Sequence, residues 1–201
     1  MNKQIPMSFG HVKITDAITN EILVEKTNAI NFENLSVAIA QSLLSGPLNA
    51  TSGPGFIYTM AFGNGGTTVS NTGIIIYNSP NTIGSSATLY NETYSKVINN
   101  YFSSNLDPIN NNIVYNHIPG KAYTDIVVSC QLDYNEPSGQ TAFDNASSLN
   151  SSQFSFDEIG LVSFNGQLLT HCIYSPVLKS ANRLYNITYT LRISTLSSLI
   201  A

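Results

Sequence analysis

Apolar and polar residues alternate along several stretches of the chain, and this period of two predicts β-strands. Residues 8–15 and 21–26 predict a hairpin near the N-terminal end. In residues 122–134 every second side chain is apolar, which predicts a strand with one face in a core. Residues 183–194 alternate in the same way and predict a second strand of this kind.

Turn signals divide the remaining β pattern. Residues 57–62 form a short apolar run that ends in the glycine-rich sequence 63–66, which predicts a strand followed by a tight loop. Residues 154–174 contain two apolar runs around Asn165-Gly166, a pair that is typical of a type I′ hairpin turn. We therefore predict a hairpin over residues 154–174.

One segment has helical spacing. Its apolar residues recur at intervals of three and four over residues 33–44. Asn31 or Asn34 is placed to cap the helix, and Gly46-Pro47 is placed to end it. The pattern predicts one short helix.

The middle of the chain carries weaker signals. Residues 67–88 are rich in Asn, Ser and Gly, and residues 89–100 fit either a strand or a helix. Long loops are predicted from Asn71 to Ser86 and over residues 136–153.

Many short strands with a single helix indicate a mainly β fold. The hairpins favour an antiparallel β-sandwich, jelly-roll-like, with one short helix near the N-terminus. No shift in composition marks a linker, so we predict a single domain over residues 1–201, in which residues 1–46 supply the N-terminal hairpin and the helix.

Charged residues make up only 10% of the chain, and its eight Lys and Arg residues are scattered. Nucleic-acid binding uses clustered basic side chains, so we expect no direct nucleic-acid partner, and the net charge of −4 disfavours an anionic membrane. An uncharged surface suits close packing between proteins, because few charges need desolvation. The N-terminal residues lack the apolar run of a secretion signal, so we expect synthesis in the cytoplasm.

The cysteine and histidine residues show no pattern that is typical of a disulfide, a catalytic cysteine or a metal site. Cys130 and Cys172 are expected to be free buried thiols, because disulfides are rare in cytoplasmic proteins. His171 and Cys172 are sequence neighbours, and neighbours in a strand point to opposite faces, so they cannot form a thiol–imidazole pair there. We predict neither a catalytic cysteine nor a transition-metal site, and no cofactor.

The glycine loop at Gly63, Gly65 and Gly66 could in principle hold a phosphate group. It lacks the lysine of a P-loop, and no helix pattern follows it, so the helix dipole that favours phosphate is missing. We interpret the loop as a tight connection after a strand.

Asp157 and Glu158 place two carboxylates in an otherwise apolar strand. One of them is expected to point inward, where it needs a hydrogen-bond or cationic partner, and Arg183 or Arg192 could supply one. We expect a structural buried carboxylate. The alternatives are a general acid, or a calcium ligand together with the acidic residues Asp133, Glu136 or Asp144.

The order of these motifs resembles the tail-collar fibre type of domain in tailed bacteriophages. The resemblance covers residues 57–194 and is carried by IYTMAFGNGGTT, LYNETYSKVIN, FSFDEIGLVSFNGQLL, YSPVLK and the closing strand. The family's structural residues match Gly63, Gly65, Gly66, Glu92, Glu158, Gly160, Leu161 and Lys179, and the turn at Asn165 and Gly166 belongs to the same pattern. The two long loops depart from the family. The chain also ends soon after the last strand, so we expect no distal fibre.

The resemblance implies a non-enzymatic structural protein of the virion, at the collar or neck, tail or baseplate. We expect it to form a homo-oligomer and to contact other virion proteins through its uncharged loops, from Asn71 to Ser86 and from Ser138 to Asn150, and through its hairpin edges. A head-fibre or capsid decoration protein is one alternative.

Two further classes of function stay open. A receptor- or carbohydrate-binding β-domain could use Tyr58, Tyr77 or Tyr101 as stacking platforms. A small hydrolase could use Asp157 or Glu158.

Overall fold

The protein is mainly β in its computed structural model, which describes residues 8–35, 38–39, 56–121, 123–134, 136–137 and 153–194. The strands are β1 (Ser8–Asp16), β2 (Ile22–Ile30), β3 (Ile57–Gly63), β4 (Thr67–Val69), β5 (Ile75–Tyr77), β6 (Glu92–Val97), β7 (Asn112–His117), β8 (Tyr123–Leu132), β9 (Gln153–Ser163), β10 (Leu168–Ser180) and β11 (Tyr185–Ser194). Nine of them form one sheet in the order β6-β3-β9-β10-β2-β1-β11-β8-β7, and β4 pairs with β5. All strand pairs of the described residues are antiparallel, from β1 with β11 to β7 with β8.

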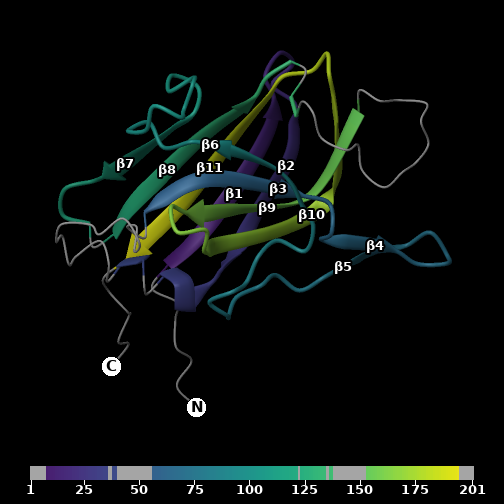
Figure 1. Ribbon diagram of the computed structural model, residues 1–201, viewed down its shortest axis with the longest axis horizontal. Coiled ribbons are helices and arrows are strands. Elements are labelled where there is room, and N and C mark those ends of the chain that lie inside the picture. The colour runs from purple at the N-terminus through teal and green to yellow at the C-terminus, as the bar shows by residue number, and fades with distance from the viewer. Residues whose placement is uncertain are drawn as a thin grey trace.

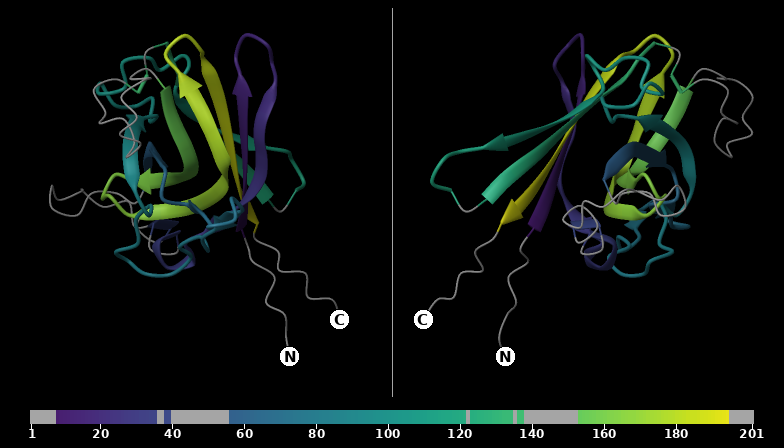
Figure 2. Two further views of the ribbon diagram at one scale, coloured as in Figure 1. Left: turned by 90° about the vertical axis from the view of Figure 1, so that its right-hand side faces the viewer. Right: turned by 60° about the vertical axis from the view of Figure 1, so that its left-hand side comes forward.

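The large sheet curls, so that β3, β9 and β10 lie across from β1, β11 and β8 (Figure 1 and Figure 2). The two halves are joined where β10 pairs with β2, and this ladder has only two residue pairs, Thr170 with Ile30 and His171 with Ala29. A short ladder of this kind lets the sheet change direction. The curl brings one face of each half against the other.

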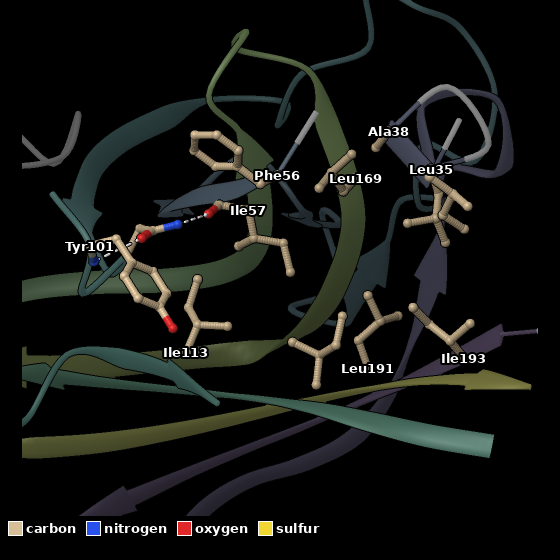
Figure 3. Close-up of a pocket in the computed structure, with 12 residues that line it drawn as sticks. Leu35, Ala38, Phe56, Ile57, Tyr101, Ile113, Leu169, Leu191 and Ile193 are labelled. Atoms are coloured by element: carbon tan, nitrogen blue, oxygen red, sulfur yellow. Dashed lines mark hydrogen bonds between the residues drawn. The ribbon is translucent and has the colours of Figure 1, made fainter. Parts of the chain in front are cut away.

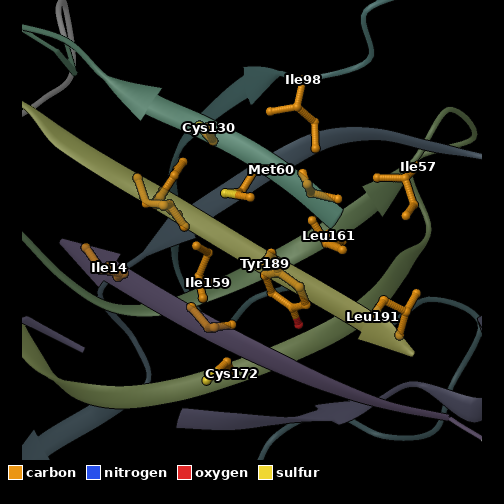
Figure 4. Packing of buried hydrophobic residues seen from close by; sticks show 14 of the residues in the cluster. Ile14, Ile57, Met60, Ile98, Cys130, Ile159, Leu161, Cys172, Tyr189 and Leu191 are labelled. Carbon is orange, nitrogen blue, oxygen red and sulfur yellow. The ribbon is translucent and has the colours of Figure 1, made fainter. Parts of the chain in front are cut away.

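The hydrophobic core fills the space inside the curl (Figure 4). Strands of one half contribute Val12, Ile14, Val128, Cys130, Leu132, Tyr185, Ile187, Tyr189 and Leu191, and strands of the other contribute Met60, Phe62, Phe154, Phe156, Ile159, Leu161, Cys172 and Tyr174. These side chains sit at every second position of their strands because a strand alternates its faces.

The strongly alternating segments are strands, as predicted. β8 and β11 pair along their full lengths, from Tyr185 with Leu132 to Ser194 with Tyr123. β1 and β2 form the N-terminal hairpin, and β3 ends at Gly63.

The hairpin of β9 and β10 is also confirmed, but its turn is not of type I′. Gly166 has a φ of 78°, while Asn165 is not among the residues with positive φ. The N–H of Gly166 donates to the carbonyl of Ser163, and the N–H of Ser163 donates to the carbonyl of Gln167. This is a three-residue loop, in which glycine adopts the left-handed conformation after a type I turn.

The N-terminal helix is described in part. Residues 32–35 and 38–39 are helical, and the Oδ1 atom of Asn31 accepts the N–H of Asn34 at 3.1 Å. Asn31 is therefore the N-cap. The rest of the predicted helix, residues 36–37 and 40–44, lies outside the described residues.

The middle of the chain contains strands that the sequence did not predict. The predicted loop from Asn71 to Ser86 contains β5, which forms a small hairpin with β4 that projects from the body (Figure 1). Residues 89–100 contain β6, and β7 had no sequence signal. The predicted interface loop from Ser138 to Asn150 lies outside the described residues.

Candidate functional site

Asp157 and Glu158 are both buried on β9, and Glu158 is 0% exposed. The expectation that one of the two carboxylates is buried is therefore confirmed, and the second is buried as well. Together with His171 on β10 they form what we call the carboxylate cluster. The cluster is the most polar group in the described interior, so it is the first candidate for chemistry.

Glu158 accepts hydrogen bonds on both of its carboxylate oxygens. The N–H groups of Gly65 and Asn91 donate to Oε1 at 3.0 and 2.8 Å. The N–H of Tyr90 and the Nε2 atom of His171 lie 2.9 Å from Oε2. These donors fill the positions at which a carboxylate ordinarily accepts hydrogen bonds.

The other ring nitrogen of His171 identifies its tautomer. The N–H of Asn81 donates to Nδ1 of His171 at 3.0 Å, so Nδ1 carries no proton. Nε2 then carries the proton and donates it to Glu158. His171 is a neutral imidazole in this arrangement, and it joins the segment around Asn81 to β9.

Asp157 is held by the glycine loop. Its Oδ1 accepts the N–H of Gly66 at 2.9 Å, and its Oδ2 accepts the N–H and the hydroxyl of Thr67 at 2.8 and 2.5 Å. Successive backbone N–H groups of this kind form an anion-binding concavity. The glycine loop thus binds anions, but the anions are two side chains of its own chain.

Gly63 shows why this loop needs glycine. A Cβ atom at Gly63 would lie 2.5 Å from Oε1 of Glu158 and 2.5 Å from the carbonyl oxygen of Asn91. No side chain fits in that space, so Gly63 permits the close approach of the carboxylate.

The two carboxylates differ in pKa. Burial raises the pKa of Asp157, and its hydrogen bonds from Thr67 and Gly66 offset this only in part. Burial acts in the same direction on Glu158, but the hydrogen bonds from His171 and from the backbone of Asn91, Tyr90 and Gly65 outweigh it, so the pKa of Glu158 is lowered. Glu158 is an anion at neutral pH.

This geometry indicates a structural role. Glu158 and His171 are fully buried and their hydrogen-bonding positions are occupied within the chain. The arginines suggested as partners for these carboxylates are elsewhere: Arg183 binds Asp16 at 2.7 Å, and Arg192 binds Asp125 at 2.6 Å. The prediction of an arginine partner was wrong, because the backbone and a histidine satisfy the charge instead.

The structure gives no support to the calcium alternative. Glu136 binds Lys96 at 2.5 Å, the N–H of Asp133 donates to Glu136, and Asp144 lies outside the described residues. Within the described part of the chain, no group of three or more His, Cys, Asp or Glu residues could hold a metal ion.

The other motif residues do not join the carboxylate cluster. Glu92 is exposed on β6, and Gly160 lies between β3 and β10, where a Cβ atom would approach the carbonyl oxygen of Thr170 to 2.7 Å. Lys179 is buried and donates to the carbonyls of Asp133 and Ser180 at 2.9 and 3.1 Å. Burial lowers the pKa of Lys179 to about 8.

Cys130 and Cys172 are free and buried, as predicted. Burial raises the pKa of each thiol to about 12. The Sγ atom of Cys172 lies 3.9 Å from the carbonyl oxygen of Thr27, whereas His171 contacts Glu158 and Asn81. The side chains of His171 and Cys172 therefore contact different parts of the protein.

The tyrosines proposed as stacking platforms differ in exposure. Tyr58 packs edge-on against Phe102 and Phe164, with ring centroids 5.1 and 5.0 Å apart. Tyr77 is partly covered, since its hydroxyl contacts Ser175 and Lys26 lies over its ring. Tyr101 is 87% exposed.

An apolar cavity of about 250 Å³ lies between the two halves of the sheet (Figure 3). Its lining consists of Leu35, Ala38, Ile39, Phe56, Ile57, Asn99, Tyr101, Ile113, Ile126, Leu169, Leu191 and Ile193. Asn99 is the only amide side chain of that lining, and it is engaged by the carbonyl of Ile57 and the N–H of Tyr101. Among the described residues that line the cavity, none carries a charged side chain.

Exposed apolar side chains are frequent in two elements of the described surface. On the β4–β5 hairpin these are Val69, Ile74, Ile75, Ile76 and Tyr77, and on and beside β7 they are Leu106, Ile109, Val114, Tyr115 and Ile118. Where exposed apolar side chains join into a patch, they mark interaction sites in soluble proteins.

The fold and the cluster define a mainly β protein with a large antiparallel curled sheet and a sealed structural carboxylate pair. Among the described residues, no helix is long and apolar enough to cross a membrane. Comparison with known proteins finds no matching family model, no similar curated protein and no similar solved structure.

Proposed function

We propose that this chain is a structural subunit of a tailed-phage virion, in the collar or neck, tail or baseplate, that acts by assembling with copies of itself and with other virion proteins. The proposal takes the sequence resemblance as its starting point. A head-fibre or capsid decoration role is the nearest alternative within the same class.

Uncharged apolar surface is the observation that carries the proposal. Tyr115 is 78% exposed and Val114 51%, and both lie in a strand without a charged residue. The β4–β5 hairpin exposes Ile74 and Ile76 in the same way. Apolar surface is costly in water and is covered in an assembly.

The carboxylate cluster supports assembly over catalysis. Glu158, whose pKa is lowered, is fully buried, and both of its carboxylate oxygens accept hydrogen bonds from the same chain. A substrate would have to break these bonds before it could reach the carboxylate. The cluster therefore contributes to the fold that presents the surface.

The detailed architecture of the sheet is also part of the proposal. We take the curled sheet to be an antiparallel β-sandwich of jelly-roll-like type, because side chains from both halves share one core and the halves meet through only two residue pairs. An experimental structure should then show two layers about 10 Å apart.

Mass spectrometry of purified virions tests the proposal. Particles are banded in a density gradient, treated with high salt to remove adsorbed proteins, and digested. We expect peptides of this chain in constant ratio to the major capsid protein across the band. A ratio that falls to background after the salt treatment would contradict the proposal.

A further inference from the structure

The nine-stranded sheet has two edge strands, β6 and β7. An edge strand presents backbone N–H and C=O groups that can pair with another strand, and proteins that stay monomeric protect such edges with charges or cover them. The two edges of this sheet differ in that protection.

The β6 edge is protected. It carries Glu92 and Lys96, and Lys96 reaches across to Glu136 at 2.5 Å and to the carbonyl of Gln131 at 2.7 Å. These contacts tie β6 to the end of β8. A second strand arriving at β6 would meet charged side chains.

The β7 edge lies at the outer border of the sheet (Figure 2). The N–H of Ile113 points away from β8, since it donates to the side chain of Asn100 at 3.2 Å. In an antiparallel ladder alternate residues face the same way, so the N–H groups of Tyr115 and His117 also point outward.

Charge singles out a second copy of this chain as the partner. No Asp, Glu, Lys or Arg occurs between Asp107 and Lys121, so all of β7 is uncharged. In a two-fold symmetric contact a residue on the axis meets its own copy, so a charge at that position would meet a like charge. An uncharged edge meets no such repulsion.

We propose that β7 pairs antiparallel with β7 of a second copy, with Tyr115 opposite Tyr115. In this register the N–H of Tyr115 donates to the carbonyl of Tyr115 in the other copy, and the N–H of His117 donates to the carbonyl of Ile113. The N–H of Ile113, which donates to Asn100 in the single chain, then donates to the carbonyl of His117 in the other copy. The pairing extends the sheet across the two-fold axis and covers Val114 and Tyr115. It deepens the proposed function and rests on the self-assembly that the function assumes.

Opposite charges at position 115 test the register. Sedimentation velocity of the full chain at micromolar concentration should show a dimer. Tyr115→Lys and Tyr115→Glu should each weaken dimerisation by roughly tenfold or more, because like charges meet on the axis. An equimolar mixture of the two variants should restore a heterodimer. Ser95→Lys, on the exposed surface of β6, is the matched control and should dimerise like the wild type.

Tyr115→Pro provides a second variant, because it removes an outward N–H and leaves the ladder to β8 intact. It should also weaken the dimer, and circular dichroism should report a folded chain. A wild-type monomer, or charged variants that dimerise normally, would overturn the inference. If both charged variants dimerise weakly and their mixture forms no heterodimer, the register with Tyr115 opposite Tyr115 is wrong. Particle mass spectrometry is independent of these results, so the virion role and the β7 contact fail separately.

Discussion

Backbone N–H groups that no neighbouring strand pairs lie around Glu158 and along the outer side of β7, and the two regions treat them differently. Around Glu158 they belong to the loops that contain Gly65 and Tyr90, and a carboxylate of the same chain accepts them. Along β7, the N–H of Ile113 donates to Asn100 on the outer side of the strand, and strand alternation places the N–H of Tyr115 on that same side, beside the exposed side chains of Val114 and Tyr115.

The difference follows from burial. A buried polar group without a partner destabilises the fold by about 1–3 kcal/mol, and a buried charge without a partner destabilises it by more. The glycine loop and Glu158 are both withdrawn from water, so each needs the other. The outward backbone groups of β7 can form hydrogen bonds with water in the monomer, so they do not need a protein partner until the chain associates. The first region serves folding and the second is suited to assembly.

Replacing Glu158 has the largest expected effect. Glu158→Gln retains the shape but turns an amide NH₂ toward backbone donors, which leaves buried N–H groups without an acceptor. We expect the free energy of unfolding to fall by roughly 3 kcal/mol. Urea denaturation followed by circular dichroism measures it. Glu92→Gln on the exposed side of β6 is the control, and equal stability of the two variants would contradict the role of the cluster.

Replacing His171 removes one donor from Glu158 and the acceptor of the Asn81 N–H. His171→Phe keeps a ring of similar size, so the packing loss is small. We expect a loss of roughly 2 kcal/mol, less than for Glu158→Gln because the backbone donors to the carboxylate remain. In the double variant with Glu158→Gln the losses should be less than additive. Strict additivity would show that the two side chains act independently.

Asp16 extends the comparison to a third carboxylate that accepts backbone N–H groups. The N–H groups of Thr19 and Ile18 donate to it at 3.0 Å, and together with Arg183 these bonds lower its pKa from 3.8 to about 2. A lowered folded-state pKa stabilises the protein above pH 4, and the stabilisation disappears as the pH falls through 2. Asp16→Asn should therefore cost up to about 2 kcal/mol at pH 6 and almost nothing near pH 2. Urea titrations at both pH values measure the difference, and a loss that persists at pH 2 would contradict this cause.

Tyr115→Lys has the smallest expected effect on the single chain. Because Tyr115 is 78% exposed, the monomer should keep its stability within about 0.5 kcal/mol even though dimerisation is lost. Thiol labelling at pH 8 provides a check on the core, since Cys130 lies on the adjacent β8 and has a pKa raised to about 12. Labelling of Cys130 should remain as slow as in the wild type. Rapid labelling would show that the edge variant disturbs the core.

Strands with strong alternation could be predicted from the sequence alone. β8 and β11 have ten residues each, and their apolar positions recur without interruption, so local pattern and tertiary burial agree. The hairpin of β9 and β10 was predicted for the same reason, while its turn type depended on the φ angle of Asn165, which the residue pair leaves open. β6 and β7, of six residues each, carry too few apolar positions for a period to be recognised.

Two acids interrupt an apolar strand at Asp157 and Glu158, so a buried carboxylate there could be predicted from local pattern alone. What holds the two carboxylates depends on the fold. The donors to Glu158 from Gly65, Tyr90 and Asn91 are 93, 68 and 67 residues away, and no local pattern encodes contacts at that separation. The same holds for the edges of the sheet. In the sheet, β7 lies at an edge, whereas β11 lies between β1 and β8. Whether a strand lies at an edge depends on which strands pair with it, and its own residues do not specify that.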